Sequence, residues 1–321
     1  MNISGPALPL VSIGVASFNN APYIRETLAS IVAQDYPNWE LIIVDDCSSD
    51  NSVEVVRAWM VEHPNIPARL IEHSRNQGVC RVLNQIIEAA KGEFVSTIGS
   101  DDNYLPNKLR AQVQAFAQLD DSYGMVYSDI VKIDAAGLPL NGGQTLLADH
   151  ATPEGNIFEH LLTENFIPAM GQLTRTAVYR ALGGFDEKLL FEDWDMWLRV
   201  AKEYHVKYVP IVAAQYRIHD RSATFQRRAQ MAEACAELLS KQLGVSASAD
   251  AIIARQLAHY AESLYWLADT KAAYWLGKAW QQGRGRRTLA LLTFARLGVA
   301  IAKLHHSYSR LRQFVGLRKP I

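Results

Sequence analysis

The sequence has few cysteines, and none of them belongs to a paired motif. Cys47, Cys80 and Cys235 are scattered with no C-x-x-C pair, which argues against a disulfide framework or a structural zinc site and favours a reducing compartment. No G-x-G-x-x-G follows the first expected strand, and no P-loop occurs anywhere, so hydride transfer and P-loop phosphoryl transfer are not the leading interpretations. No basic region precedes the first apolar residues, so we expect a cytoplasmic protein without a signal peptide.

The chain also lacks a net excess of either charge. It has 32 Lys and Arg against 33 Asp and Glu, which excludes a uniformly basic nucleic-acid binder, and we expect no nucleic-acid partner. The balance hides an asymmetry, because residues 271–321 hold 11 basic residues and no acidic one. Residues 1–270 then carry 21 basic and 33 acidic residues, a formal charge of −12. The two parts must face different partners, or each other.

What the sequence does contain is a regular alternation of β-type and helical patterns. Short runs of β-branched residues alternate with segments whose apolar residues recur at helical spacing. The expected elements are strands at 10–16, 41–44, 70–71 and 94–98 and helices over 24–32, 53–60 and 83–90. This order predicts an α/β fold, a doubly wound and mainly parallel sheet flanked by helices. Ligands bind such sheets at the carboxyl ends of the strands.

Polar and acidic residues follow three of these strands. The first strand ends near Ser17 and Asn19, the second is followed by the pair Asp45–Asp46, and the fourth by Asp101–Asp102. Any one of these groups could simply cap the next helix. Two acid pairs at one edge, however, would repel each other unless a cation or a hydrogen-bonding ligand compensates them. A divalent metal ion on the carboxylates is the natural compensator.

In this order and spacing, the motifs resemble those of the family 2 glycosyltransferases, which have the GT-A fold. The resemblance covers about residues 8–225, and we expect residues 1–225 to form the catalytic domain. The motifs that carry it are QDYPNWELIIVDDCSSD at 34–50, NQG at 76–78, SDD at 100–102, GGFDE at 183–187 and EDWDMWLR at 192–199.

The resemblance implies a nucleotide-sugar site at the carboxyl edge of the sheet. Ser17 and Asn19 would line the nucleotide pocket, and Asp46 would hydrogen-bond the base, with Asp45 supporting it. Arg81 either reaches the nucleotide or is a solvated surface charge. A UDP-sugar is the expected donor.

The resemblance also implies a metal site and a base. Asp102 would coordinate Mn2+ or Mg2+, and Asp101 would contact the ribose or sugar of the donor. Glu192 and Asp193 match the pair in which the family's catalytic base lies, with the second acid favoured. His219 would bind the metal or the diphosphate.

Two further segments are expected near the substrates. Arg217 or Arg221 could neutralise phosphate oxygens, since both lie in the YRIHDRS stretch that resembles the end of these catalytic domains. Residues 155–182 are the expected wall of the acceptor site. Carboxylates at helix N-termini, such as Asp193, also occur simply as complements of the helix dipole.

The implied reaction is a single displacement with inversion onto a hydroxyl of a glycan or a lipid-linked oligosaccharide, in the synthesis of a surface polysaccharide. Two alternatives use the same residues. One is a non-catalytic scaffold that binds nucleotide sugar or glycan. The other, a phospho-receiver domain, is disfavoured because its acid pair would follow the first strand, whereas Asp45–Asp46 follows the second.

The last part of the chain, residues 226–321, is expected to be helical. Residues 288–304 are apolar, but Arg296 and Lys303 interrupt them well short of a membrane span. This segment predicts either a basic amphipathic helix on the inner face of the cell membrane or a helical arm that packs against protein, as in a homo-oligomer. The basic run at 284–287 could also contact an acceptor diphosphate.

Overall fold

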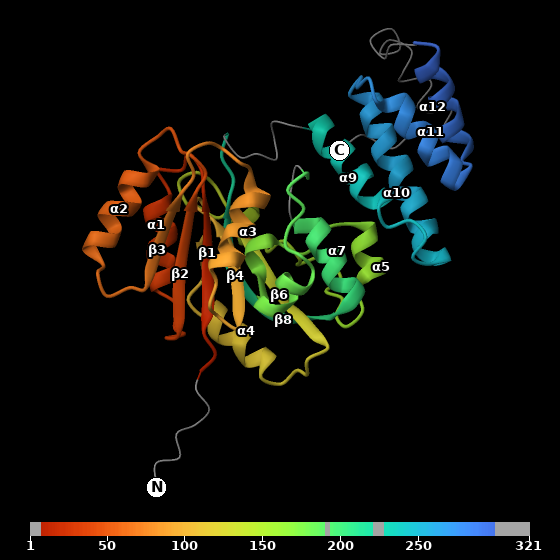
Figure 1. Ribbon diagram of the computed structural model, residues 1–321. Coiled ribbons are helices and arrows are strands. Elements are labelled where there is room, and N and C mark those ends of the chain that lie inside the picture. The colour runs from red at the N-terminus through yellow and green to blue at the C-terminus, as the bar shows by residue number, and fades with distance from the viewer. Residues whose placement is uncertain (1–7, 190–192, 221–227, 299–321) are drawn as a thin grey trace. The chain divides into compact units, whose positions relative to one another are not determined.

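The computed structural model describes residues 8–189, 193–220 and 228–298 (Figure 1). The chain divides into two compact units, Met1–Asp220 and Arg221–Ile321. The boundary expected after residue 225 falls outside the described residues, so it stays a prediction.

Among the described residues, eight strands form one sheet in the order β3-β2-β1-β4-β7-β6-β8-β5 (Figure 1). β1 is parallel to β2 and β4, β2 to β3, and β6 to β8, whereas β7 is antiparallel to β4 and β6, and β5 to β8. The strands are β1 (Val11–Ser17), β2 (Trp39–Asp45), β3 (Ala68–Glu72), β4 (Phe94–Gly99), β5 (Asn103–Tyr104), β6 (Tyr123–Ile133), β7 (Gln172–Arg175) and β8 (His205–Arg217).

This topology brings the ends of distant strands to one edge. Two antiparallel steps separate β4 from β6, so β6 and β8 run in the same direction as β1 to β4. The carboxyl ends of β1, β2, β3, β4 and β8 therefore lie at the same edge, and β5 begins there. The expected α/β class with a mainly parallel sheet is confirmed, and the antiparallel strands β5 and β7 make the sheet mixed.

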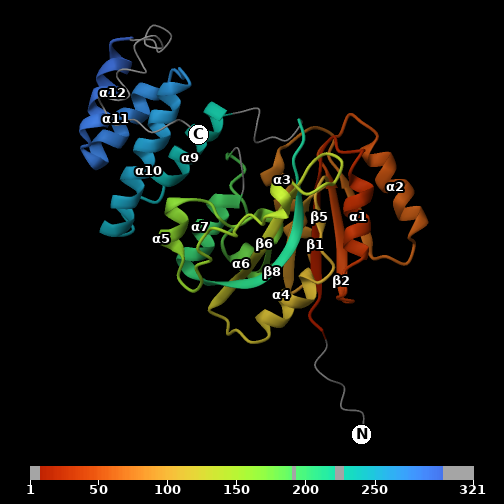
Figure 2. The same ribbon diagram turned by 180° about the vertical axis from the view of Figure 1, so that it is seen from behind.

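Helices cover both faces of the sheet (Figures 1 and 2). Val11, Ile13 and Val15 of β1 are buried in one core with residues of α1, α2 and α4. Gly14 faces the other way, where a methyl group would lie 2.3 Å from Ile86 of α3, so only glycine allows this helix so close to the sheet. The helices of this unit are α1 (Ile24–Val32), α2 (Ser52–Glu62), α3 (Val79–Ala89), α4 (Lys108–Phe116), α5 (Phe158–Thr163), α6 (Thr176–Ala181) and α7 (Asp193–Glu203).

The second unit is helical in its described part, in agreement with the sequence pattern. α10 packs against the other three helices and is capped by Ser246, whose hydroxyl accepts a hydrogen bond from the Ala249 N–H. The helices are α9 (Arg228–Ser240), α10 (Ala247–Trp266), α11 (Ala272–Gly283) and α12 (Arg286–Arg296). Within the described ranges, no helix is both long and apolar enough to cross a membrane.

Candidate functional site

The loop after β2 is tied to the end of β1 by hydrogen bonds. The Ser17 hydroxyl donates to Oδ2 of Asp45 over 2.8 Å, and Oδ1 of Asp45 accepts the Ser48 N–H over 2.8 Å. Asn19, with a φ of 53°, accepts the Ser49 N–H over 2.7 Å. These residues therefore shape the wall of the carboxyl edge, and Asp45 supports the loop from a buried position.

Asp46 is held at the N-terminus of α3. Its Oδ1 accepts the Gln77 N–H and its Oδ2 the Gly78 N–H, both over 2.8 Å. Nδ1 of the buried His73, which follows β3, lies 2.7 Å from the same Oδ1, and its Nε2 contacts Gln85. Two backbone amides and an imidazole thus fix the orientation of this carboxylate, and the helix N-terminus favours its charge.

The acid pair after β4 converges on one small space. A methyl group at Gly99 would lie 2.8 Å from Oδ1 of Asp101 and 3.3 Å from Oδ2 of Asp102, so both carboxylates lie over this glycine. Nε2 of His219 lies 3.0 Å from Oδ2 of Asp101. Asp102 is 3% exposed, and its Oδ1 accepts the Arg217 backbone N–H over 2.8 Å. The structure therefore brings the three predicted residues Asp101, Asp102 and His219 together.

The charge of Asp102 is only partly compensated by the groups around it. Burial, and then the charge of Asp101, raise the pKa of Asp102 well above its ordinary value, against the opposing effect of Arg217. Carboxylate oxygens and an imidazole nitrogen are suitable ligands for Mn2+ or Mg2+. Within the described part of the chain, no group of three or more His, Cys, Asp or Glu side chains could hold a metal ion by itself. A cation here would need further oxygen ligands.

Asp193 lies at the first turn of α7, which is anchored by the buried Trp194, Trp197 and Leu198. Its Oδ1 accepts the Trp194 N–H over 2.6 Å, and its Oδ2 accepts Nδ2 of Asn165 over 2.9 Å. Burial raises the pKa of the Asp193 carboxyl, and these two hydrogen bonds oppose the shift. The arrangement suits an oriented proton acceptor with a raised pKa.

The residues that precede α7 contact α3, the helix whose N-terminal end holds Asp46. The Asn84 side chain on α3 accepts the Phe185 N–H over 2.7 Å and donates to the Phe185 carbonyl over 3.0 Å. The Cys80 thiol donates to the Leu189 carbonyl over 3.8 Å. α3 thus connects the loop after β2 with the chain that precedes Asp193.

One predicted residue, Arg81, pairs with acids outside these clusters. Nη1 of Arg81 lies 3.1 Å from Glu88 and 3.5 Å from Glu187, so in this structure the guanidinium pairs with acids on α3 and on the GGFDE loop. Its contact with a nucleotide stays a prediction. Glu192 lies outside the described residues.

The sequence reasoning missed His73 and Asn165, which orient Asp46 and Asp193. The sequence contained one indication of a role for His73, because this residue directly follows a strand at the edge where the acids gather. Asn165 lies within the expected acceptor wall, but no pattern singled it out. It also missed Glu26 on α1, which pairs with Arg217.

Comparisons with known proteins agree with this architecture. An "Uncharacterized glycosyltransferase" of Rickettsia felis is 28% identical over 224 residues, which cover 67% of this chain and 35% of the relative. A "Putative teichuronic acid biosynthesis glycosyltransferase TuaG" of Bacillus subtilis is 31% identical over 133 residues, 41% of this chain and 51% of the relative. The chain thus spans about a third and about half of the length of these two proteins.

Two solved structures share the fold. S. aureus TarS 1-349 in complex with UDP-GlcNAc superposes with a TM-score of 0.64 and 20% identity, covering 94% of this chain and 91% of TarS. The mannosyltransferase PcManGT of Pyrobaculum calidifontis, in complex with GDP-Man and Mn2+, superposes with a TM-score of 0.60 and 22% identity, covering 95% of this chain and 84% of PcManGT. The likeness confirms the expected GT-A fold. The model "Glycosyl transferase family 2" matches residues 12–177, more than half of the chain, and the protein therefore belongs to glycosyltransferase family 2.

Proposed function

We propose that this glycosyltransferase moves a sugar, with inversion, from a UDP-sugar to a hydroxyl of a glycan or lipid-linked oligosaccharide, with Mn2+ or Mg2+ as cofactor. The observation that carries the proposal is the convergence of the Asp101 and Asp102 carboxylates over Gly99, beside His219, at the carboxyl edge of the sheet. The teichuronic acid name of TuaG supports surface polysaccharide synthesis as the setting, and the UDP-GlcNAc bound to TarS supports a uridine donor.

The residues of the donor site divide into three roles. Asp46, fixed by His73 and the amides at the start of α3, offers a carboxylate to N–H groups of the base. Ser17 and Asn19 hold the loop around it, and Arg81 would exchange its acidic partners for the nucleotide.

Asp102 and His219 would hold the cation, with Asp101 beside them. The Mn2+ in the PcManGT structure supports this choice, and no protein cluster of the described chain supplies a full ligand set, so diphosphate oxygens would complete it. When bound, the cation supplies positive charge to the diphosphate as it leaves. Asp101 is then free to meet a hydroxyl of the ribose or the sugar.

The chemical step needs a base for the acceptor hydroxyl, and Asp193 is our candidate. The acceptor oxygen attacks the anomeric carbon as the bond from that carbon to the diphosphate oxygen breaks, and the diphosphate keeps the electron pair. The hydroxyl proton passes to Asp193, whose raised pKa makes it a stronger acceptor than an ordinary carboxylate. Asn165 keeps Oδ2 in place. Glu192 would assist from the residue before.

A transfer assay with and without the base tests this proposal. The wild-type protein with a UDP-sugar and Mn2+ should release UDP, and Asp193→Asn should lower kcat by about 10²–10⁴-fold while it still binds UDP with Mn2+. A wild-type protein that binds UDP but neither transfers nor hydrolyses any donor would overturn the enzymatic account in favour of a non-catalytic scaffold.

The second unit is proposed to place the enzyme on an anionic membrane, at the inner face of the cell membrane. α12 and the residue that follows it expose Leu289, Phe294 and Leu297 together with Arg286 and Arg296, and acidic residues are absent from 271–321 of the sequence. Exposed apolar side chains flanked by cations suit an anionic interface. Packing of the same helices into a homo-oligomer is the competing outcome.

A further inference from the structure

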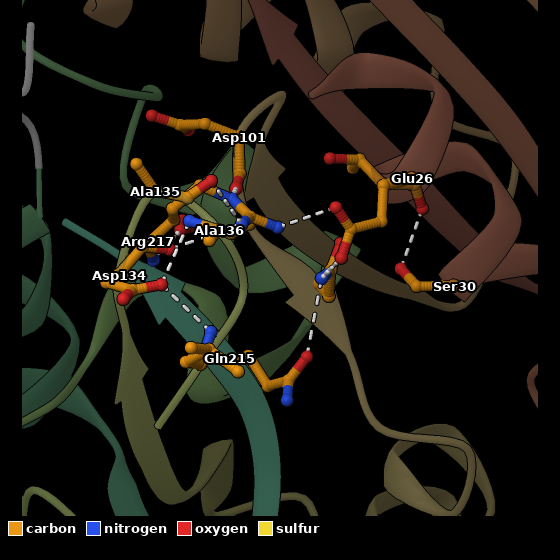
Figure 3. Close-up of polar contacts among 12 residues, drawn as sticks. Glu26, Ser30, Asp101, Asp134, Ala135, Ala136, Gln215 and Arg217 are labelled. Atoms are coloured by element: carbon orange, nitrogen blue, oxygen red, sulfur yellow. Dashed lines mark hydrogen bonds and ion pairs between the residues drawn. The ribbon is translucent and has the colours of Figure 1, made fainter. Parts of the chain in front are cut away.

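We propose that Arg217 and Glu26 form a clamp that positions the acid motif Asp101–Asp102–Asn103 for the cation and diphosphate, so that Arg217 is a positioning residue and not a phosphate ligand. This inference rests on the proposed function, because the clamp matters only if the motif binds a metal-bound diphosphate. Figure 3 shows Arg217 with Glu26 of α1 on one side, Asp134 and Ala135 of the turn after β6 on the other, and Asp101 above it.

Arg217 contacts both acids of the motif. Its Nε donates to the Asp101 carbonyl over 2.8 Å, and its backbone N–H donates to Oδ1 of Asp102 over 2.8 Å. Its Nη1 donates to the carbonyls of Asp134 and Ala135, both over 3.3 Å, in the turn after β6 (Figure 3). A single residue at the end of β8 therefore fixes the main chain of one acid and the carboxylate of the next.

Glu26 closes the clamp from α1 and reaches the third residue of the motif. Its Oε2 accepts Nη2 of Arg217 over 2.8 Å, and its Oε1 accepts Nδ2 of Asn103 over 2.6 Å. The Asn103 side chain is thereby turned toward α1. Each residue of the motif is held by one of the two members of the clamp.

The burial of Arg217 shows why its guanidinium needs these partners. The side chain is 1% exposed, whereas that of Glu26 is 53% exposed, and an unpaired buried charge is strongly destabilising. The guanidinium also lies 4.8 Å from the centroid of the Tyr23 ring, against which the His219 ring stacks at 5.1 Å. Nε, Nη1 and Nη2 are all engaged with protein acceptors, so Arg217 could reach a phosphate only by breaking the clamp.

Positioning has a direct consequence for cation binding. Asp101 and Asp102 repel each other while no cation is bound, so the loop that carries them would relax if nothing fixed it. A planar guanidinium serves several acceptors at fixed angles, whereas a lysine ammonium is a point charge on a flexible stem. Residues that hold the ligands of a metal typically contribute 10–100-fold to its affinity.

The test measures binding of Mn2+ in the presence of UDP by isothermal titration calorimetry. We expect Arg217→Lys to weaken the Mn2+ affinity by about 10–100-fold. Arg175→Lys is the matched control: Arg175 is also largely buried, donates Nε to the Tyr123 carbonyl, and lies at the opposite end of the strands beside Glu93. Both variants should lower the melting temperature, but Arg175→Lys should leave the Mn2+ affinity unchanged.

Glu26→Gln is the second variant and keeps the test valid if Arg217→Lys does not fold. It should weaken Mn2+ binding in the same direction, whereas Glu62→Gln, which breaks the surface pair with Arg25, should not. If Arg217→Lys or a folded Glu26→Gln binds Mn2+ and UDP as tightly as the wild-type protein, the clamp is not a positioning device. If the wild-type protein itself binds no UDP with Mn2+, the proposed function fails first, and this inference with it.

Discussion

At the scale of single residues, the pKa of Asp193 is set by burial against two hydrogen bonds. Burial raises the pKa, whereas the bonds from Asn165 and from the Trp194 N–H lower it. A base acts only when it is ionised, so the rate should fall as the pH drops through a pKa that lies above the ordinary value for an aspartate.

Removal of one of these bonds should move that limb of the pH profile. In Asn165→Ala the pKa of Asp193 should rise further, which shifts the acidic limb of kcat to higher pH and lowers kcat at pH 5 by about 10-fold. Steady-state rates between pH 5 and pH 9 measure the shift. Asn156→Ala, which removes a side chain that accepts the Phe158 N–H at the start of α5, should leave the limb in place. A limb that stays fixed or moves to lower pH in Asn165→Ala would contradict the role of Asp193.

The ionised form of Asp102 has opposite effects on binding and on stability. It is the form proposed to hold the cation, but it destabilises the metal-free protein. The pKa of Asp102 is raised in the folded protein, so the folded state holds the proton more tightly than the unfolded chain does. Stability from this group is therefore greatest below the ordinary aspartate pKa and is lost as the pH rises through the raised value.

Asp102→Asn should consequently raise the melting temperature of the metal-free protein by a few degrees at pH 7 and change it little near pH 3. Calorimetry in the presence of a chelator measures both values. The gain arises because the amide removes the buried charge and its repulsion with Asp101 but keeps an oxygen for the Arg217 N–H. An equal loss of stability at both pH values would show that burial of the Asp102 charge is not the controlling factor.

At the scale of elements, the backbone conformation at the start of α3 positions Asp46, the proposed partner of the nucleotide base. Gly78 has φ 87° and ψ 159°, a region that is almost exclusive to glycine, and its N–H donates to Asp46. Gly78→Ala should cost about 1–3 kcal/mol of stability and displace this donor, so the UDP affinity should fall.

Gly244→Ala is the matched control for this prediction. Gly244 has a φ of 89°, and as at Gly78 no heavy atom lies within 4 Å of an added methyl group, but it belongs to the helical unit. Titration of both variants with UDP and Mn2+ should show weaker binding for Gly78→Ala alone. Unchanged binding in Gly78→Ala would remove Asp46 from the nucleotide site.

The elements that the sequence predicted are those defined by short-range patterns. The strands around residues 10–16, 41–44 and 94–98 are confirmed because runs of β-branched residues can be recognised without knowledge of their neighbours. The acids at the carboxyl edge could also be predicted, because they lie at or just after the ends of those strands. The strands β5 and β7 are antiparallel and only 2 and 4 residues long, which is too short for an alternating apolar pattern to predict them.

The pairings within the site could not be read in the same way. His73 meets Asp46, and Asn165 meets Asp193, across intervals of 27 and 28 residues that depend on loop geometry. The positioning role that we propose for Arg217 could not be read from the sequence either, where its place in the YRIHDRS stretch favoured a contact with phosphate oxygens. Its burial and its pairing with Glu26, 191 residues away, become visible only in the folded chain.

At the scale of the whole molecule, the basic second unit should determine membrane binding. Each cation near an anionic surface contributes about 1 kcal/mol, so the double variant Arg286→Gln/Arg296→Gln should weaken binding to phosphatidylserine vesicles by about 30-fold. Vesicle flotation at low and high salt measures the effect. The double variant Lys91→Gln/Lys202→Gln removes the same charge from the catalytic unit and should have little effect. Equal losses in both double variants would indicate non-specific attraction. If the wild-type protein does not bind vesicles, the membrane role is wrong and the helical unit contacts protein instead.

The central claim is that carboxylates from separate strands form one metal-dependent nucleotide site. Isothermal titration of the wild-type protein and of Asp102→Asn with UDP, in the presence and absence of Mn2+, tests it most directly. We predict that the wild-type protein binds UDP far more tightly with Mn2+ than without it, and that Asp102→Asn loses this dependence. UDP binding that is indifferent to both Mn2+ and the Asp102→Asn substitution would contradict the account.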